Sequence, residues 1–466
     1  MLRVVTCWLA FGLGLGHEQW RFLKRRGRNL DEHQQNSKHC RHPLTKRKVK
    51  WPESLVGRAG KLNFDTYSGY IKVTVEEEEE PEYLFYLFYT SQDQDPNAPL
   101  IVWLNGGPGC SSMEGATTEN SPLILFDIKG SGQARAFSRN LYSINAHANV
   151  LYLDQPRRVG FSYGYGSQVS STKQAAADVV RFLREFTSSV FPEFAQRQLV
   201  LSGESYAGQY IPAFASAIID FNAANPSRNA SINLAALAIG NGCINSTVQE
   251  DNSKLFAFLR ESNLLSSDAS TPSSYDKAMK AVTATLGYRP NAFDYRLGAF
   301  DCLKCSGGYN YTAWAAWMFD SELRAALHTC GTSGTDAFKL SGGCISFNDF
   351  DKDDTFDYTA ALGMALDAGI QVRLFYGKTD LACHYVGGLS ATNAIPWREA
   401  QAFRLAQMKP LYAHGEIEVG QVRAHGGLSF YQLEQAGHMS FIDQPASVAV
   451  IFLAMLKELA LARNKF

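Results

Sequence analysis

Short apolar runs alternate with longer amphipathic stretches along most of this chain. In the stretches 172–190, 206–221 and 447–462, apolar residues recur at helical spacing. Strands that alternate with helices predict an α/β fold with a mostly parallel central sheet flanked by helices. The runs with strand length and composition are Tyr83–Tyr89, Leu100–Leu104, Val150–Leu153, Gln198–Leu201, Leu234–Ile239 and Val372–Tyr376.

One region interrupts this alternation. From about residue 243 to 360 the chain is helical in pieces, rich in Ser, Gly and Cys, and lacks a strong buried strand. We expect a helical cap inserted over the carboxyl edge of the strands, where sheet enzymes keep their sites. The acidic run Glu76–Glu80 precedes Pro81 and predicts a solvated hairpin loop.

The N-terminus differs from the rest in composition. Arg3 and the apolar run Val4–Leu15 predict a signal peptide over residues 1–16, with a buried strand or a misassigned start as alternatives. Residues 17–61 then form a basic N-terminal extension, read either as a pro-segment or as a disordered tail without a role. Its dibasic pairs Arg25-Arg26 and Lys46-Arg47 are candidate processing points. The main folded domain is expected to span 62–466.

Charge and cysteine content narrow the class of protein. Residues 17–50 carry eleven Lys and Arg against three acids, which leaves residues 51–466 with a charge of about −10. An acidic body does not indicate nucleic-acid binding, and we expect no membrane span. Nine cysteines favour an oxidising compartment. Sequons for N-glycosylation occur at Asn229, Asn245 and Asn310.

A serine nucleophile is predicted within Gly203-Glu204-Ser205-Tyr206-Ala207-Gly208. This segment follows a strand and precedes a helix, the context of a nucleophile elbow. The turn needs small residues two positions before and two positions after Ser205, and Ala207 replaces the usual second glycine.

A hydroxyl needs a histidine to take its proton and an acid to orient that histidine. The chain order serine, acid, histidine is satisfied by Asp380, after the strand Val372–Tyr376, and His438, after the apolar run Leu428–Leu433. The competing histidines are read as surface or structural residues: His147, His384 and His425.

A glycine-rich loop is the candidate for the rest of the oxyanion hole. Asn105-Gly106-Gly107-Pro108-Gly109 follows the strand Leu100–Leu104, although such a loop can also be a tight turn and nothing more. No phosphate-loop lysine follows, which argues against nucleotide binding.

Taken with Trp103–Ser112 and Ala436-Gly437-His438-Met439, these motifs make the chain resemble the serine carboxypeptidase family, over about residues 62–460. The resemblance implies an α/β-hydrolase fold with a cap, and no cofactor or metal. It implies a triad of Ser205, Asp380 and His438, with the N–H groups of Gly107 and Tyr206 as the oxyanion hole. It also implies a set of substrate-binding residues that grips the peptide C-terminus: Asn105, Gly106, Glu119, Glu204 and Met439.

Two glutamates can hold a carboxylate only while they retain a proton, because like charges at contact repel. We therefore expect peptide hydrolysis to be favoured at acid pH and to fade as Glu204 and Glu119 ionise.

The resemblance also implies pairings of cysteines. It implies a Cys110–Cys344 disulfide, a local Cys302–Cys305 disulfide and an unpaired Cys383 near the site. A redox or zinc CxxC remains the alternative for Cys302 and Cys305. The pairing of Cys243 with Cys330 follows by elimination only.

The main departure from the family pattern is Arg157-Arg158, where a small apolar residue and glycine are usual. An arginine in place of glycine strains a backbone that requires positive φ.

We expect a secreted serine carboxypeptidase that releases C-terminal residues of peptides through an acyl-enzyme, with a vacuole or lysosome-like compartment as the alternative location. The alternatives in function are a related acyltransferase and a catalytically silent secreted binding protein. The oligomeric state is open.

Overall fold

The structure is a computed structural model. It describes residues 45–75, 80–125, 136–227, 231–266, 272, 274–298, 314, 318, 320–330, 344, 350 and 355–463. The expected signal peptide, the acidic run 76–79, Asn229, Asn310, Cys302 and Cys305 lie outside these residues.

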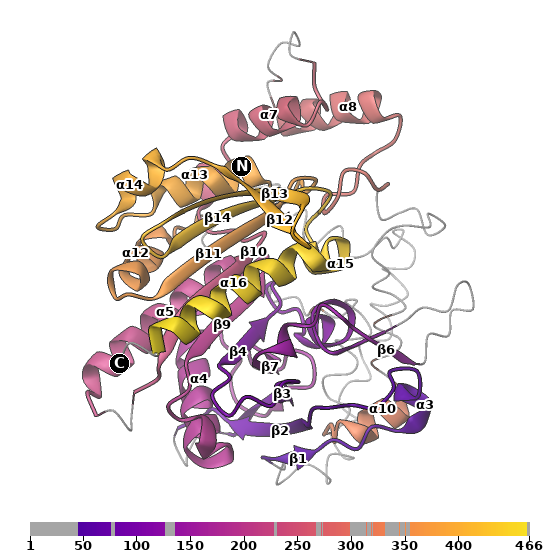
Figure 1. The fold of residues 1–466 in the computed structure, drawn as a ribbon, viewed down its shortest axis with the longest axis vertical. Coiled ribbons are helices and arrows are strands. Elements are labelled where there is room, and N and C mark those ends of the chain that lie inside the picture. Colours follow the sequence, from indigo (N-terminus) through magenta and orange to yellow (C-terminus); the bar gives the residue numbers. More distant parts are fainter. Residues whose placement is uncertain are drawn as a thin grey trace.

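A twelve-stranded mixed sheet forms the centre of the described chain (Figure 1). All six predicted strands lie in this sheet, and its middle, from β7 through β14, is parallel. On both sides the pairing becomes antiparallel, so the predicted parallel sheet describes the middle only. In spatial order the strands are β1 (Arg47–Lys48), β2 (Thr66–Lys72), β3 (Glu82–Tyr89), β7 (Asn149–Leu153), β4 (Leu100–Leu104), β9 (Leu199–Glu204), β10 (Leu234–Gly240), β11 (Gln371–Gly377), β14 (Leu428–Leu433), β13 (Ile417–His425) and β12 (Lys409–Ala413), with β8 (Tyr163–Gly164) paired to β3.

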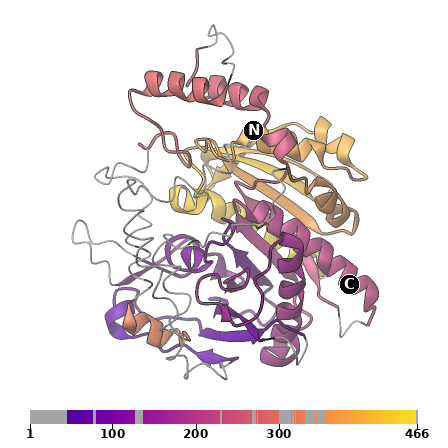
Figure 2. The ribbon, with the colours of Figure 1, turned by 180° about the vertical axis from the view of Figure 1, so that it is seen from behind.

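Both faces of the sheet are apolar and covered. Consecutive residues of a strand point to opposite faces, so Val102 belongs to one buried cluster and Trp103 to the other. Helices α4, α5, α12 and α13 cover the first face, whereas α16 lies across the second (Figures 1 and 2). The described helices are α3 (Glu53–Val56), α4 (Thr172–Glu185), α5 (Ala207–Ala224), α6 (Ser246–Gln249), α7 (Asn252–Glu261), α8 (Tyr275–Leu286), α10 (Ser321–Ala326), α12 (Thr359–Asp367), α13 (Tyr385–Ala394), α14 (Ala400–Leu405), α15 (Ser440–Asp443) and α16 (Pro445–Arg463).

One described helix, α16, is long and apolar enough to cross a membrane by length and composition. Its Ile451, Phe452 and Met455 are almost fully buried in the second cluster. This helix is therefore part of the cover of the sheet.

The packed chain begins earlier than the expected start at Leu62. Strand β1 pairs with β2, and Val49, Leu55 and Val56 are buried in the second cluster. The ammonium of Lys46 donates to the Val190 carbonyl at 3.1 Å. The basic extension is thus folded onto the sheet from about residue 45.

Between β10 and β11 the described residues form helices α6, α7, α8, α10 and α12 and no named strand. A separate two-stranded ribbon, β5 (Leu123–Leu125) and β6 (Phe137–Arg139), follows the glycine-rich loop and a helical turn at Gly115–Glu119. In Figure 1, α7 and α8 lie beyond the β14 side of the sheet.

Candidate active site

Ser205 lies in the sharp turn between β9 and α5. Its φ of 63° is left-handed backbone, which is unfavourable for a residue with a side chain. Its N–H donates to the Gly240 carbonyl at 3.0 Å, which holds the turn on the sheet. A Cβ on Gly203 would lie 2.1 Å from the Leu104 carbonyl oxygen, so this position must be glycine. The elbow therefore presents the Ser205 side chain at the carboxyl edge of the parallel strands.

Asp380 and His438 meet at the same edge. Asp380 follows β11, His438 follows β14, and His438 Nδ1 lies 2.7 Å from Asp380 Oδ2. Both side chains are buried. A buried carboxylate bonded to Nδ1 fixes the imidazole so that Nε2 is the nitrogen left for chemistry.

Two further groups hold the carboxylate of Asp380. Asn241 Nδ2 donates to Asp380 Oδ2 at 2.8 Å, and the Ala382 N–H donates to Oδ1 at 2.8 Å. Ser440 Oγ in turn donates to Asn241 Oδ1 at 2.8 Å. The sequence assigned no role to Asn241, because no local pattern marks a residue that orients the acid.

The hydroxyl of Ser205 is buried and forms no hydrogen bond within the part of the chain that the structure describes. Catalytic hydrogen bonds in structures without substrate are often long and shorten only when substrate binds.

The glycine-rich loop after β4 lies directly against the elbow. A Cβ on Gly106 would lie 2.5 Å from the Tyr206 nitrogen and 2.8 Å from Ser205 Cβ. Gly107 has a φ of 115°, a conformation that side chains rarely adopt. These two glycines bring the backbone of the loop next to the Tyr206 N–H, as two donors to one oxyanion require.

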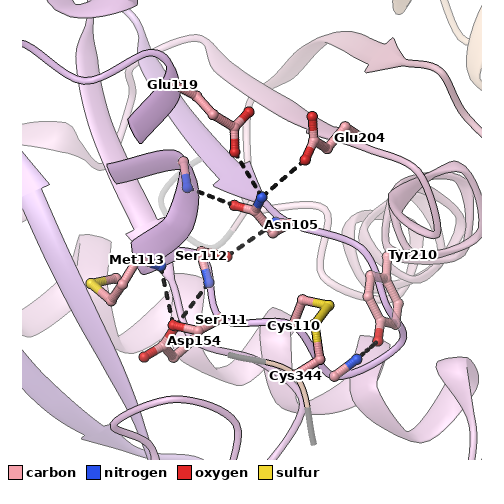
Figure 3. Close-up of a disulfide and its surroundings, with 12 residues drawn as sticks. Asn105, Cys110, Ser111, Ser112, Met113, Glu119, Asp154, Glu204, Tyr210 and Cys344 are labelled. Atoms are coloured by element: carbon pink, nitrogen blue, oxygen red, sulfur yellow. Dashed lines mark hydrogen bonds between the residues drawn. A yellow bond between two sulfur atoms is a disulfide. The ribbon is translucent and has the colours of Figure 1, made fainter. Parts of the chain in front are cut away.

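Asp154 anchors this loop from below (Figure 3). Its Oδ1 accepts from Ser111 Oγ at 2.6 Å and from the Ser112 N–H at 3.0 Å, and its Oδ2 accepts from the Phe161 N–H at 2.8 Å. Burial raises the pKa of Asp154 to about 7, although these hydrogen bonds lower it. The Cys110–Cys344 disulfide, the pairing that the resemblance implied, fixes the far end of the loop to the insertion (Figure 3).

Asn105 joins the two glutamates beside the elbow (Figure 3). Its Nδ2 donates to Glu119 Oε1 at 3.0 Å and to Glu204 Oε1 at 3.1 Å, while its Oδ1 accepts from Trp103 Nε1 at 2.7 Å. The side chains of Asn105, Glu119 and Glu204 are all buried. Trp103 thus orients the amide so that its donors face the glutamates.

The environment of the glutamates favours their neutral forms. Burial and then the charges of Glu119 and Glu114 raise the pKa of Glu204 well above its usual value. Burial also raises the pKa of Glu119, against the hydrogen bond from Asn105. The pair can therefore hold a proton under conditions in which exposed glutamates have lost theirs.

Of the remaining predicted substrate-binding positions, Met439 is buried directly after His438. Tyr206, predicted as a donor of the oxyanion hole, is partly buried at the start of α5, where its ring packs edge-on against Tyr210 with the ring centroids 4.9 Å apart.

Arg158 does occupy the strained backbone that its position suggested, with a φ of 67°. Its Nη2 donates to Glu82 Oε1 at 2.8 Å. Arg157 forms a two-pronged pair with Asp178 on α4, at 2.6 and 2.9 Å. Both arginines that depart from the family pattern thus form an ion pair with a carboxylate.

Two expectations about cysteines are corrected. Cys243 forms a disulfide with Cys383, so Cys383 is not an unpaired thiol and Cys243 does not pair with Cys330. The cause is tertiary: the Cys243 N–H donates to the Ser205 carbonyl at 3.1 Å, which brings Cys243 to the edge where the Asp380 loop ends.

The expectation of a glycan on Asn245 does not fit the structure either. This side chain is buried, and it caps α6 by accepting from the Val248 N–H at 2.9 Å.

Comparison with known proteins assigns the family. A serine carboxypeptidase family model matches residues 56–290 and 300–458. Carboxypeptidase Y homolog A of Uncinocarpus reesii is 31% identical over 419 residues, covering 83% of this chain and 73% of that protein. The homolog from Podospora anserina is 33% identical over 409 residues, covering 81% and 70%. The chain belongs to the serine carboxypeptidase family.

The fold agrees with this assignment. The crystal structure of Kex1Δp, a prohormone-processing carboxypeptidase from Saccharomyces cerevisiae, superposes with a TM-score of 0.70 at 24% identity, covering 88% of this chain and 95% of that one. The chain therefore has the α/β-hydrolase fold. The family model and the curated relatives make it a serine carboxypeptidase, a family whose substrates are peptides.

Proposed function

We propose that Ser205, Asp380 and His438 are the catalytic triad of this carboxypeptidase. The observation that carries the proposal is the buried His438–Asp380 hydrogen bond at the sheet edge where the elbow presents Ser205. In the first step Ser205 Oγ attacks the scissile carbonyl carbon and His438 Nε2 takes the hydroxyl proton. Asp380 stabilises the imidazolium that forms. His438 then gives this proton to the leaving amine, and an acyl-enzyme remains for water to hydrolyse in the same way.

The N–H groups of Gly107 and Tyr206 act as the oxyanion hole. The close approach of Gly106 to the Tyr206 nitrogen supports this role, because it brings the glycine-rich loop next to the nucleophile turn. Donors arranged in advance stabilise the developing negative charge without reorganisation, and the loss of one such donor costs about 3 kcal/mol of transition-state stabilisation.

Asn105, the Gly106 N–H, Glu119 and Glu204 bind the terminal carboxylate of the peptide. The side-chain amide of Asn105 already donates to both glutamates, and burial favours a proton on the pair. A protonated glutamate donates a hydrogen bond to the substrate carboxylate, whereas two ionised glutamates repel it. Activity on peptides should therefore be favoured at acid pH, with Met439 lining the pocket of the residue that is released.

The disulfides and the expected acid pH optimum are both consistent with a location on the secretory route. Two disulfides join distant parts of the described chain, and disulfides persist in oxidising compartments. Export or delivery to an acidic vacuole would both provide such conditions.

Labelling with a serine-directed fluorophosphonate tests the proposed nucleophile. We expect the wild-type protein to be labelled, and Ser205→Ala to lose the label while it keeps the same melting temperature. Labelling that persists in Ser205→Ala would place the nucleophile elsewhere, and an unlabelled wild type would indicate a silent binding protein.

A further inference from the structure

A short segment of the insertion, Asn291–Tyr295, lies between the two loops that carry Asp380 and His438. Its backbone bonds to both. The Ala292 carbonyl accepts from the N–H groups of Leu381 and Ala382 at 3.0 and 2.9 Å, and the Phe293 carbonyl accepts from the His438 N–H at 2.7 Å. We call Asn291–Tyr295 the clamp.

Hydrogen bonds within the clamp and to its neighbours hold its backbone in one conformation. Asn291 Oδ1 accepts from the Phe293 N–H at 2.8 Å, and the Asn291 N–H donates to the Leu297 carbonyl at 2.8 Å. The Tyr295 N–H donates to the Thr379 carbonyl at 3.0 Å, next to Asp380. A segment fixed at both ends and within its own turn can hold a side chain in one place.

Gly437 permits the clamp to come this close. A Cβ at that position would lie 2.5 Å from the Phe293 carbonyl oxygen and 2.8 Å from Asp294 Cβ. The glycine before His438 therefore serves contact with the clamp, a role that the Ala436-Gly437-His438-Met439 motif did not reveal.

The ring of Phe293 stacks on the imidazole of His438. The ring centroids are 4.7 Å apart and the planes are inclined by 16°. A stacked aromatic ring restricts rotation of the imidazole about its bond to Cβ, and its π face attracts a positive charge above it. Both effects act on the residue that must accept and return a proton.

We infer that Phe293 is a positioning residue for His438, in addition to Asp380. The inference rests on the proposed triad. The clamp lies in the gap between the two segments that the family model matches, 56–290 and 300–458, so family membership does not supply it. Asp380 fixes the imidazole through its edge, whereas Phe293 fixes it through its face.

The test is the second-order rate of fluorophosphonate labelling, which reports activation of Ser205 without a peptide-binding step. Phe293→Leu removes the π face and keeps an apolar side chain. We expect its labelling rate and its kcat on peptides to fall about tenfold with little change in KM, because small misplacements of a catalytic group cost this much or more. Phe293→Tyr keeps the ring and should restore most of the rate.

The chain offers a matched control. Phe258 stacks on the buried His384 with centroids 5.0 Å apart and planes inclined by 21°, and His384 has no proposed part in the chemistry. Phe258→Leu should lower the melting temperature and leave the labelling rate unchanged. If Phe293→Leu also changes only the melting temperature, the inference is overturned.

Two further measurements keep the test decisive. If Phe293→Leu does not fold, Phe293→Met replaces it with an unbranched side chain and the same prediction. Loss of labelling in Ser205→Ala, together with normal labelling in Phe293→Leu, would overturn the clamp and leave the proposed function intact. Labelling that survives in Ser205→Ala would overturn the proposed function itself.

Discussion

The guanidinium of Arg158 donates to the carboxylate of Glu82 at 2.8 Å, although the arginine holds a backbone conformation better suited to glycine. Glu82 is fully buried on β3, while the Arg158 side chain is about one-third exposed, at 34%. Backbone strain at Arg158 therefore destabilises the native state, whereas its ion pair with the buried Glu82 stabilises it.

The variant Arg158→Gly measures which effect on the free energy of unfolding is larger, the backbone strain or the ion pair. Glycine relieves about 1 kcal/mol of backbone strain, but an unpaired buried charge costs about 3 kcal/mol or more. We expect the free energy of unfolding to fall by about 2 kcal/mol in chemical denaturation. The double variant Arg158→Gly with Glu82→Gln should recover most of this loss. A stabilised Arg158→Gly would show that strain outweighs the ion pair.

The pH dependence of peptide binding depends on Glu204. Its raised pKa keeps it protonated at acid pH, and the proton is lost as the pH rises through that value. KM for a peptide with a free C-terminus should therefore rise with pH in the wild type. In Glu204→Gln this rise should be much smaller, because the amide stays neutral and can still donate. The C-terminal amide of the same peptide is the control, since it carries no charge to repel. An unchanged pH dependence in Glu204→Gln contradicts the proposed carboxylate site.

Stability should also depend on pH. A salt-bridged acid makes the free energy of unfolding rise with pH, whereas the buried acids of this protein should make it fall. Burial raises the pKa of Asp154 to about 7, above the value of about 4 for an unfolded aspartate. Between these values the native state binds more protons than the unfolded state, so the free energy of unfolding falls as pH rises. The buried Glu119 and Glu204 act in the same direction.

Denaturation by urea at a series of pH values checks this expectation. We predict a decline in stability from about pH 4 to about pH 7, and a shallower decline in the double variant Glu119→Gln with Glu204→Gln. The buried His384, whose pKa burial lowers to about 4, acts in the opposite direction in both proteins, so the comparison between them is the test. A decline as steep in the double variant as in the wild type would show that the two glutamates do not hold these protons.

Asn241 should act on catalysis through Asp380. Asn241→Leu removes the donor to Asp380 Oδ2 and leaves the His438 bond in place. We expect kcat to fall about tenfold with KM nearly unchanged, since the imidazole loses part of its orientation. Asn241→Ser retains a hydroxyl donor and serves as the comparison. A change confined to KM would assign Asn241 to substrate binding instead.

The Cys243–Cys383 disulfide joins residues 140 positions apart. Closing so long a loop stabilises the native state by about 5 kcal/mol through the entropy of the unfolded chain. We expect Cys243→Ser and Cys383→Ser to lower stability by the same amount, and the double variant to lower it no further. Cys383 of the wild type should react with a thiol reagent only after reduction. Labelling of Cys383 without reduction would contradict the disulfide.

Much of the fold could be predicted from local pattern, and the parts that could not have physical reasons. The buried strand Leu100–Leu104 has the same bounds in prediction and structure, because an apolar run covered on both faces is unambiguous. Strands β12 and β13 lie at an exposed edge and alternate polar with apolar residues, so no continuous apolar run marks them.

The site shows the same limit. The elbow, the acid and the histidine could be named because each follows an apolar strand in a fixed order. The clamp carries no such local signal, because Phe293 reaches His438 only through tertiary contacts. The partner of Cys383 was equally hidden, since 140 residues separate it from Cys243.

The most direct test of the central claim is the release of a free amino acid from an N-blocked dipeptide at acid pH. We predict that the wild type releases the C-terminal residue, and that Ser205→Ala retains less than about one part in 10⁴ of the wild-type kcat. The same rate in Ser205→Ala, or transfer of the acyl group to an alcohol with no released amino acid from the dipeptide, would contradict the account.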